Sequence, residues 1–316
     1  MIRTLLTILA VTGANCLGAD LLQLDGTPFL PTVPVTWDAP TDALPNRITI
    51  YQTVPQRLSD MAISNVLAIG SFKRTDGKLS KDGKTMRWQD ATKNPTRTLE
   101  ITPGLGLIRY SNNKAIADMG AAIHDVPDER ATEQLALDYA LRVEAATNQL
   151  AFHPRFGTDE KRSHFARDGK ATYEDIVAMR GLMFSRQIDG IRFAGASGRG
   201  GFAIEFGNDA KVSKLHLNWC SLKPVSEEQT ATPSKILSWV QNGSAVLSAD
   251  SPSLDEPPRR LTVKKITPLY LGGIAGESSK RIYPFALLDV VAETGNGSNM
   301  VFYLNCPIIS LQRNDR

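Results

Sequence analysis

The chain has 316 residues, of which 42% are hydrophobic and 22% charged, and its formal net charge is +3. These values are ordinary for a globular protein that is long enough to fill more than one core. The 36 basic and 33 acidic residues are spread without a block of one sign. Proteins that bind nucleic acid usually carry a basic stripe or cluster, so we expect no nucleic-acid partner.

The N-terminus is typical of a secretory signal peptide. Arg3 gives a positive start, the apolar run 5–11 follows, and small residues come next. We predict a signal peptide over residues 1–19 and a secreted or periplasmic mature chain; an uncleaved anchor or a buried strand is the alternative. The small residues after which cleavage fits are Ala14, Gly18 and Ala19. The apolar run is shorter than the roughly 20 residues of a membrane span, so we expect no transmembrane anchor in the mature chain.

Two cysteines remain after such a leader, Cys220 and Cys306. In an oxidising compartment they could form a disulfide, and they could equally be buried thiols. The sequence leaves both states open.

A proline-rich segment follows the leader, with five prolines between residues 28 and 45. We predict that residues 20–45 form an extended arm outside the core.

Residues 46–126 are predicted to form an N-terminal α+β unit. Alternating β-branched residues indicate a strand at 47–54 that ends before Pro55. A short helix is expected at 58–67. Further strands of a meander are expected at 85–88, 98–102 and 107–110.

Residues 127–225 are predicted to form a second unit, which begins with the clearest helix, at 128–150. A charged loop is expected at 153–170, and the acidic pair Glu174–Asp175 suits a helix start. Strands are then expected at 182–184, 191–194, 202–206 and 212–219.

Residues 226–316 repeat the scheme. Thr232 is the expected N-cap of a helix with Pro233 in its first turn and Gly243 at its end. Strands are expected at 261–271, 282–291 and 300–309. The predicted fold class is therefore α+β, with tandem units of a helix packed on an antiparallel β-sheet.

The glycine-rich stretch 195–201, GASGRGG, suggests three catalytic loops, and its context excludes each of them. A Walker loop requires Lys and then Ser or Thr after its last glycine, but Phe202 follows Gly201. A dinucleotide-binding loop opens a helix, whereas a strand follows here. A nucleophile elbow requires glycine where Arg199 stands. We therefore predict a hairpin connection.

Two segments carry a family resemblance: FSRQIDGIRFAG (184–195) and GGFAIEFGNDAKVSKLHLNW (200–219). Their spacing resembles the repeats of PepSY-like and YycH/YpeB-like secreted bacterial proteins. The residues that fill the pattern are Arg186, Asp189, Gly190, Gly201, Gly207, Asp209, Lys211 and Trp219. Ala210 departs from the usual turn glycine. The resemblance implies PepSY/cystatin-like layers and a role in binding or modulating another exported protein, such as a peptidase or a sensor.

The four histidines are His124, His153, His164 and His216. None forms the spaced pairs or Cys/His clusters of a metal site, so we predict no catalytic residue, metal or cofactor. Exposed loops suggest Arg199, His153 and His164 as contacts for a partner.

The sequence thus favours a non-enzymatic binding or regulatory protein. The alternatives are an exported hydrolase that uses His153 or His164 on cell-wall or peptide substrates, and a structural envelope protein.

Overall fold

A computed structural model of the chain describes residues 24, 26–54, 57–116, 123–152, 158–167, 170–194, 201–252, 256–271, 280–295 and 297–310, with the backbone alone at 152, 158–167, 170–176 and 194. The α-helices are α1 (Asp60–Gly70), α2 (Glu129–Arg142) and α3 (Pro233–Gln241). The strands are β1 (Val35–Trp37), β2 (Arg47–Val54), β3 (Lys78–Leu79), β4 (Met86–Gln89), β5 (Arg97–Thr102), β6 (Leu107–Asn112), β7 (Leu150–Phe152), β8 (Thr158–Arg167), β9 (Lys170–Ile188), β10 (Ile191–Ala194), β11 (Gly201–Phe206), β12 (Val212–Asn218), β13 (Ser221–Gln229), β14 (Val246–Leu247), β15 (Arg260–Leu271), β16 (Arg281–Ile282), β17 (Pro284–Glu293) and β18 (Asn299–Pro307).

Most of these strands join in one sheet. It has 15 strands in the order β14-β18-β17-β15-β10-β9-β11-β12-β6-β5-β4-β3, with β1 beside β15 and with β7 and β8 beside β9. β1 and β10 run parallel to β15, whereas the other pairs are antiparallel, so the sheet is mixed. A smaller sheet has the order β13-β2-β16.

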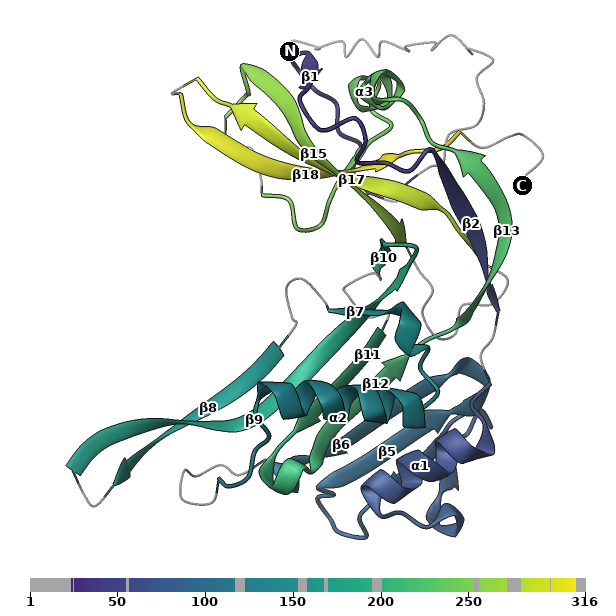
Figure 1. The fold of residues 1–316 in the computed structure, drawn as a ribbon, viewed down its shortest axis with the longest axis vertical. Helices are drawn as coiled ribbons and strands as arrows, with labels where there is room; N and C mark the ends of the chain where they lie inside the picture. Colours follow the sequence, from purple (N-terminus) through teal and green to yellow (C-terminus); the bar gives the residue numbers. More distant parts are fainter. Residues whose placement is uncertain are drawn as a thin grey trace, which may run out of the picture.

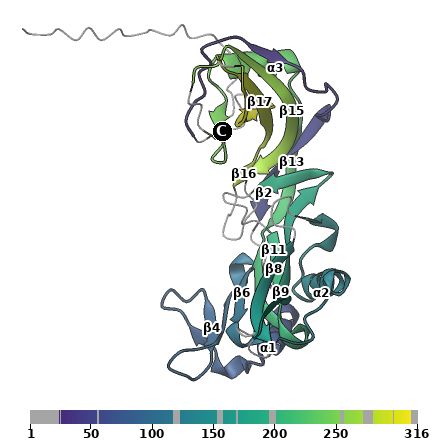
Figure 2. The same ribbon diagram turned by 90° about the vertical axis from the view of Figure 1, so that its left-hand side faces the viewer.

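The molecule has two lobes (Figures 1 and 2). The lower lobe contains α1, α2, β3–β6, β11 and β12, and the upper lobe contains β1, α3, β14, β15, β17 and β18. β9 runs up through the lower lobe and turns at Asp189–Gly190 into β10, which pairs with β15. Both turn residues have positive φ, 51° and 78°, as a two-residue type I′ hairpin requires. One continuous run of strands therefore joins the lobes.

Each lobe has its own core. In the lower lobe, Phe202, Ile204 and Phe206 alternate along β11 and are fully buried, as a half-buried strand requires. α1 and α2 pack against the same core. In the upper lobe, Ile236 and Val240 of α3 lie in a core with the alternating residues of β15, β17 and β18. Burial of each such side chain contributes about 1.5–3 kcal/mol.

The predicted fold class was wrong. The chain is mostly β, with a large mixed sheet instead of tandem units of a helix on an antiparallel sheet. The physical reason is long-range pairing: β12 pairs with β6 from Lys214↔Ser111 to Asn218↔Leu107. The strands β4, β5, β6, β9, β11 and β12 thereby lie in one sheet and, with α1 and α2, contribute to one core. β9 and β10 extend the sheet into the upper lobe.

The charged segment around Glu174–Asp175 is also different from the prediction. Residues 158–167 form β8, and β9 runs for 19 residues where a loop and a helix start were expected. α2 is shorter than predicted, because Glu144 adopts a φ of 61° just after its C-cap at Val143. The Glu144 carboxylate accepts hydrogen bonds from the backbone N–H and hydroxyl of Ser59, the N-cap of α1.

The proline-rich segment is more closely packed than predicted. Phe29 and Val35 are buried in the upper core, and β1 pairs with β15 from Val35↔Leu261 to Trp37↔Val263. The prediction of an arm outside the core was therefore wrong for this part. The predicted leader, residues 1–19, lies outside the described residues.

The caps of α3 were predicted correctly. The Thr232 hydroxyl accepts a hydrogen bond from the Lys235 N–H at 3.4 Å, and Pro233 opens the helix. Gly243, with a φ of 81°, follows its end. Of the helices in the described residues, none is long and apolar enough to cross a membrane.

Candidate functional site

Of the three residues predicted to contact a partner, two lie outside the described part of the chain and one is described by its backbone alone. Arg199 and His153 lie outside the described residues. The backbone of His164 lies on β8, opposite Asp175 of β9. The described structure thus brings no two of these residues together.

The strand that carries His164 belongs to a two-stranded ribbon, formed by residues 158–167 and 170–179, that extends away from the lower lobe (Figure 1). β8 pairs with β9 from Thr158↔Leu182 to Arg167↔Lys170. β11 pairs with β9 only over residues 180–185, and β7 only over 184–186. Among the described strands, the outer half of β9 therefore has β8 as its neighbour and leaves its second edge open.

The glycine-rich stretch begins the next strand. Residues 195–200 lie outside the described part, but Gly201 is the first residue of β11. β10 and β11 do not pair with each other; both pair with β9. The predicted hairpin connection was therefore wrong. Gly201 is required for a structural reason: a Cβ there would lie 2.0 Å from the Phe184 carbonyl oxygen on β9.

Two residues of the resemblance pattern, Arg186 and Trp219, are in contact between the lobes. Arg186 is 4% exposed, and its Cζ lies 4.6 Å from the Trp219 ring centroid and 5.5 Å from that of Phe193. It donates hydrogen bonds to the Cys220 carbonyl at 2.7 Å and to the side chain of Gln149 at 2.8 Å. Burial lowers the pKa of Arg186 to about 10. Trp219 belongs to the lower core and Phe193 to the upper one, so this guanidinium links the two.

A turn before β12 places a small polar cluster at the surface of the lower lobe. Asp209 lies 2.7 Å from Lys211 Nζ and 3.1 Å from His124 Nε2. The hydrogen bond and charge of Lys211 hold the pKa of Asp209 below its usual range. Asp209 and Ala210 have φ values of 56° and 53°. His216 lies further along β12, between Ala203 and Arg109 on the neighbouring strands.

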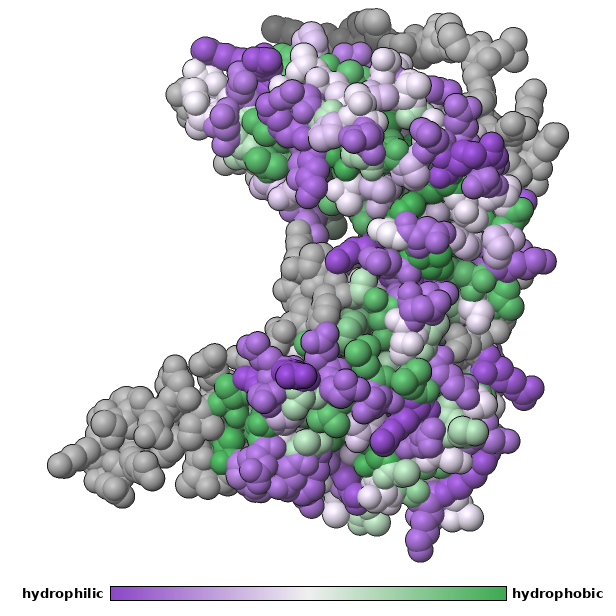
Figure 3. All heavy atoms as spheres, in the orientation of Figure 1, coloured by the Kyte–Doolittle hydropathy of each residue, from purple (hydrophilic) through white to green (hydrophobic). Residues whose placement is uncertain are grey.

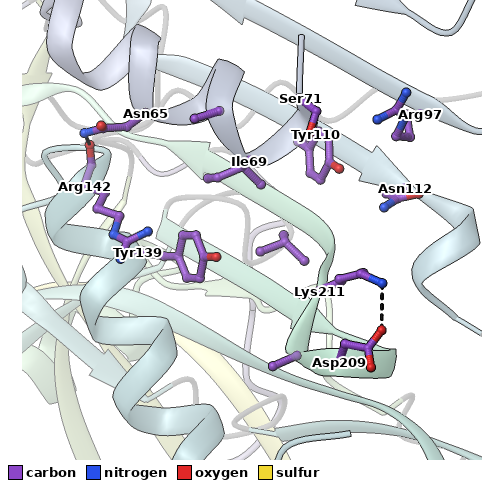
Figure 4. A pocket seen from close by; sticks show the side chains of 13 residues that line it. Asn65, Ile69, Ser71, Arg97, Tyr110, Asn112, Tyr139, Arg142, Asp209 and Lys211 are labelled. Carbon is purple, nitrogen blue, oxygen red and sulfur yellow. Dashed lines mark hydrogen bonds and ion pairs between the residues drawn. The ribbon is translucent and has the colours of Figure 1, made fainter. Parts of the chain in front are cut away.

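A cleft lies beside this cluster, between α1, α2 and the sheet. Its volume is about 620 Å³. Figure 4 shows Arg142 and Tyr139 of α2 on one side and Arg97, Asn112 and Lys211 on the other. The lining residues are Asn65, Ala68, Ile69, Ser71, Arg97, Tyr110, Asn112, Tyr139, Arg142, Asp209, Ala210, Lys211 and Val212. We call this the α1–α2 cleft.

Two of its three cations are already paired. Arg97 Nε and Nη2 both lie 2.8 Å from Asp90 Oδ1, and Nη1 donates to the Gly70 carbonyl. Hydrogen bonds from Arg97, and then from Thr96, lower the pKa of Asp90 to about 2. Lys211 pairs with Asp209. Both pairs fix their side chains at the rim of the cleft.

The third cation, Arg142, is exposed and has no ion pair with a carboxylate of the described residues. Its Cζ lies 5.0 Å from the ring centroid of Tyr139. That ring in turn packs against Phe206, with centroids 5.8 Å apart. Tyr139 therefore holds the guanidinium in place by a cation–π contact. The guanidinium N–H groups can donate hydrogen bonds to a bound anion.

Sequence reasoning missed this cleft. Arg97, Tyr139, Arg142 and Lys211 come from separate segments and share no motif spacing. Tyr139 and Arg142 lie in the predicted helix 128–150, and Lys211 was part of the resemblance pattern. No local signal distinguishes Arg142 from an ordinary surface arginine.

Two further expectations concern metals and cysteines. Within the described residues, no group of three or more His, Cys, Asp or Glu side chains could hold a metal ion. Cys220 and Cys306 are both buried and form no disulfide, and burial raises the pKa of the Cys306 thiol to about 12.

Comparisons with known proteins include a distant structural likeness. No family model matches the sequence, and no curated protein is similar to it. An uncharacterized protein from Eubacterium rectale ATCC 33656, known from a crystal structure, matches with a TM-score of 0.43 and 11% sequence identity. The match covers 89% of this chain and 90% of that one.

Proposed function

We propose that the protein is a secreted or periplasmic, non-enzymatic binding protein that modulates another exported protein, such as a peptidase or a sensor. The N-terminal sequence supports export, because its charge and apolar run suit a signal peptide. The PepSY-like and YycH/YpeB-like pattern around Arg186 and Trp219 agrees with a modulatory role.

The observation that carries the proposal is the β8–β9 ribbon. Its outer part, residues 163–167 and 170–176, is two strands wide and is paired with no other described strand. A row of backbone N–H and C=O groups at such an edge can pair with a strand of another protein. A two-stranded ribbon is also marginally stable alone, so an added strand would stabilise it.

A shortened ribbon tests this role. Arg162 lies opposite Val177, so residues 163–176 can be replaced by Asn-Gly, which favours a two-residue hairpin turn. The full chain and this variant are each immobilised and exposed to the exported proteome of the native host. We expect the full chain to retain one protein in a stoichiometric amount. The variant should retain at least about tenfold less of that protein, which corresponds to a loss of about 1.4 kcal/mol or more in binding free energy.

His164→Ala in the full ribbon is the matched control, because it removes the side chain and keeps both edges. It should retain the partner, since recognition here uses the backbone. Thermal unfolding of both variants checks that the body of the molecule is intact. If the full chain retains no protein across a range of salt concentrations, or if the shortened variant retains as much, the proposal is wrong.

A further inference from the structure

We infer that the α1–α2 cleft binds an acidic peptide segment, with Arg142 as the residue that recognises its carboxylate. The inference rests on the proposed function, because the segment would belong to the protein partner. It concerns a site separate from the β8–β9 ribbon, so the two can be tested independently.

The charge of the cleft favours an anion. Its lining has three cations and one carboxylate, Asp209. Arg97 and Lys211 are compensated by Asp90 and Asp209, which leaves the charge of Arg142 uncompensated among the described residues. A guanidinium that is already held against an aromatic ring loses little freedom on binding, and its planar donors match both oxygens of a carboxylate.

The remainder of the lining suits a peptide. Ile69 and Val212 give the cleft an apolar part that can contact an aliphatic side chain beside the acidic one. Asn65 carries an amide group that can pair with a peptide backbone, whereas the Asn112 Oδ1 already accepts a hydrogen bond from the Lys114 N–H at 3.2 Å. The Asn65 Nδ2 already donates to the Arg142 carbonyl at 2.9 Å, which ties α1 to the end of α2 and leaves the Asn65 carbonyl oxygen as an acceptor.

The aromatic residues argue against an acidic sugar as the ligand. Sugar sites generally offer an open aromatic face. Tyr139 is covered by Arg142 and packs against Phe206, while Tyr110 is 4% exposed. Figure 3 also shows mainly hydrophilic side chains on the drawn face of the lower lobe, with small hydrophobic areas between them. Charge and hydrogen bonding would therefore dominate recognition.

The test is selection from a phage-displayed library of random octapeptides on the immobilised full chain. We expect the selected peptides to be enriched in Asp and Glu relative to the unselected library. Their affinity, measured by isothermal titration calorimetry, should fall about tenfold or more in Arg142→Gln, because a charge-assisted hydrogen bond is lost. It should also fall as salt concentration rises.

Arg130→Gln is the matched control. Arg130 is exposed on the same helix and undergoes the same change in charge, so this variant should bind within about twofold of the wild type. The inference is overturned if the selected peptides are not enriched in acids, if no peptide is selected, or if Arg142→Gln binds as well as Arg130→Gln. Stronger binding of oligogalacturonate than of the peptides would also overturn it.

The proteome capture described above separates the two proposals. If Arg142→Gln retains the partner and the shortened ribbon does not, the proposed function stands whatever the peptide selection shows. If the full chain selects acidic peptides but retains no exported protein, the cleft assignment stands and the proposed function fails.

Discussion

The guanidinium of Arg186 lies over the indole ring of Trp219, with Cζ 4.6 Å from the ring centroid. It is buried, and its described hydrogen-bond partners are a backbone carbonyl at Cys220 and the side chain of Gln149, both neutral. A buried cation without a carboxylate partner is costly unless hydrogen bonds and aromatic faces compensate it. Here the compensating groups come from the segment before β7, from β10 and from the two residues that follow β12, so the contact depends on both lobes being in place.

Replacement of this arginine by lysine should therefore destabilise the protein. The new side chain would keep the charge, but its ammonium cannot reproduce the planar stacking and both hydrogen bonds. We expect Arg186→Lys to lower the free energy of unfolding by about 2–4 kcal/mol, measured by urea denaturation. Arg130→Lys on the exposed face of α2 is the control and should change it by less than about 0.5 kcal/mol. If Arg186→Lys lowers the free energy of unfolding by as little as the control does, the stacking and hydrogen bonds of Arg186 do not stabilise the contact between the lobes.

Gly201 tests the close approach of β11 to β9. A Cβ at this position would lie 2.0 Å from the Phe184 carbonyl oxygen, so Gly201→Ala must push the strands apart or break their pairing. We expect it to lower the free energy of unfolding by about 2 kcal/mol or more. Gly104→Ala is the control, because a Cβ there meets nothing within 4 Å, and it should have little effect. Equal behaviour of the two variants in thermal unfolding would show that the strands can separate at little cost.

Local features of the fold were predictable from sequence. The alternation of Phe202, Ile204 and Phe206 indicated β11, and Thr232 followed by Pro233 indicated the start of α3. In both cases the signal lies within a few residues, because side-chain direction and capping depend on the local backbone.

Long-range pairing was not predictable. The outer part of β9 contains Glu174 and Asp175 and is extended because β8 pairs with it, which no periodicity within the segment reveals. The same holds for the parallel pairing of β10 with β15, which joins residues far apart in sequence. Because these pairings decide that the lobes share a sheet, the fold class could not be read from the order of helices and strands.

The α1–α2 cleft was unpredictable for a related reason. Arg142 ends one helix and Lys211 follows a turn some distance along the chain, and each resembles an ordinary surface residue. Two features distinguish Arg142: the ring of Tyr139 lies beneath its guanidinium, and it has no carboxylate partner among the described residues. Both are properties of the folded chain.

Asp90 should make stability depend on acid pH. Hydrogen bonds from Arg97 and Thr96 lower its pKa from 3.8 to about 2. Because the pKa of Asp90 is lower in the folded chain, the unfolded chain takes up the proton first as the pH falls. The stabilisation from the ionised Asp90 is therefore fully present above about pH 4 and is lost as the pH falls to about 2. We expect Asp90→Asn to lower the free energy of unfolding at pH 7 by about 1–2 kcal/mol, given the partial exposure of Arg97, and to lower it little at pH 2.

Urea denaturation at pH 7, 4 and 2 measures this difference. Asp42→Asn, at an exposed position in the turn before β2, supplies the matched change from a carboxylate to an amide. A gap between wild type and Asp90→Asn that stays constant from pH 7 to pH 2 would mean that the pair with Arg97 does not contribute through its charge.

Ala210 is a residue at which a substitution should stabilise the protein. Its φ of 53° lies in the left-handed region, which costs a residue with a Cβ roughly 1 kcal/mol and costs glycine little. Ala210→Gly should raise the free energy of unfolding by about 0.5–1 kcal/mol, the gain being reduced by the greater freedom of glycine in the unfolded chain. Gly190→Ala is the converse: its φ is 78° and a Cβ there meets nothing within 4 Å, so backbone strain alone should destabilise it by a similar amount. Differential scanning calorimetry of both variants shows whether each raises or lowers the midpoint of thermal unfolding. A lower midpoint for Ala210→Gly than for the wild type would show that the turn before β12 is not strained at this residue.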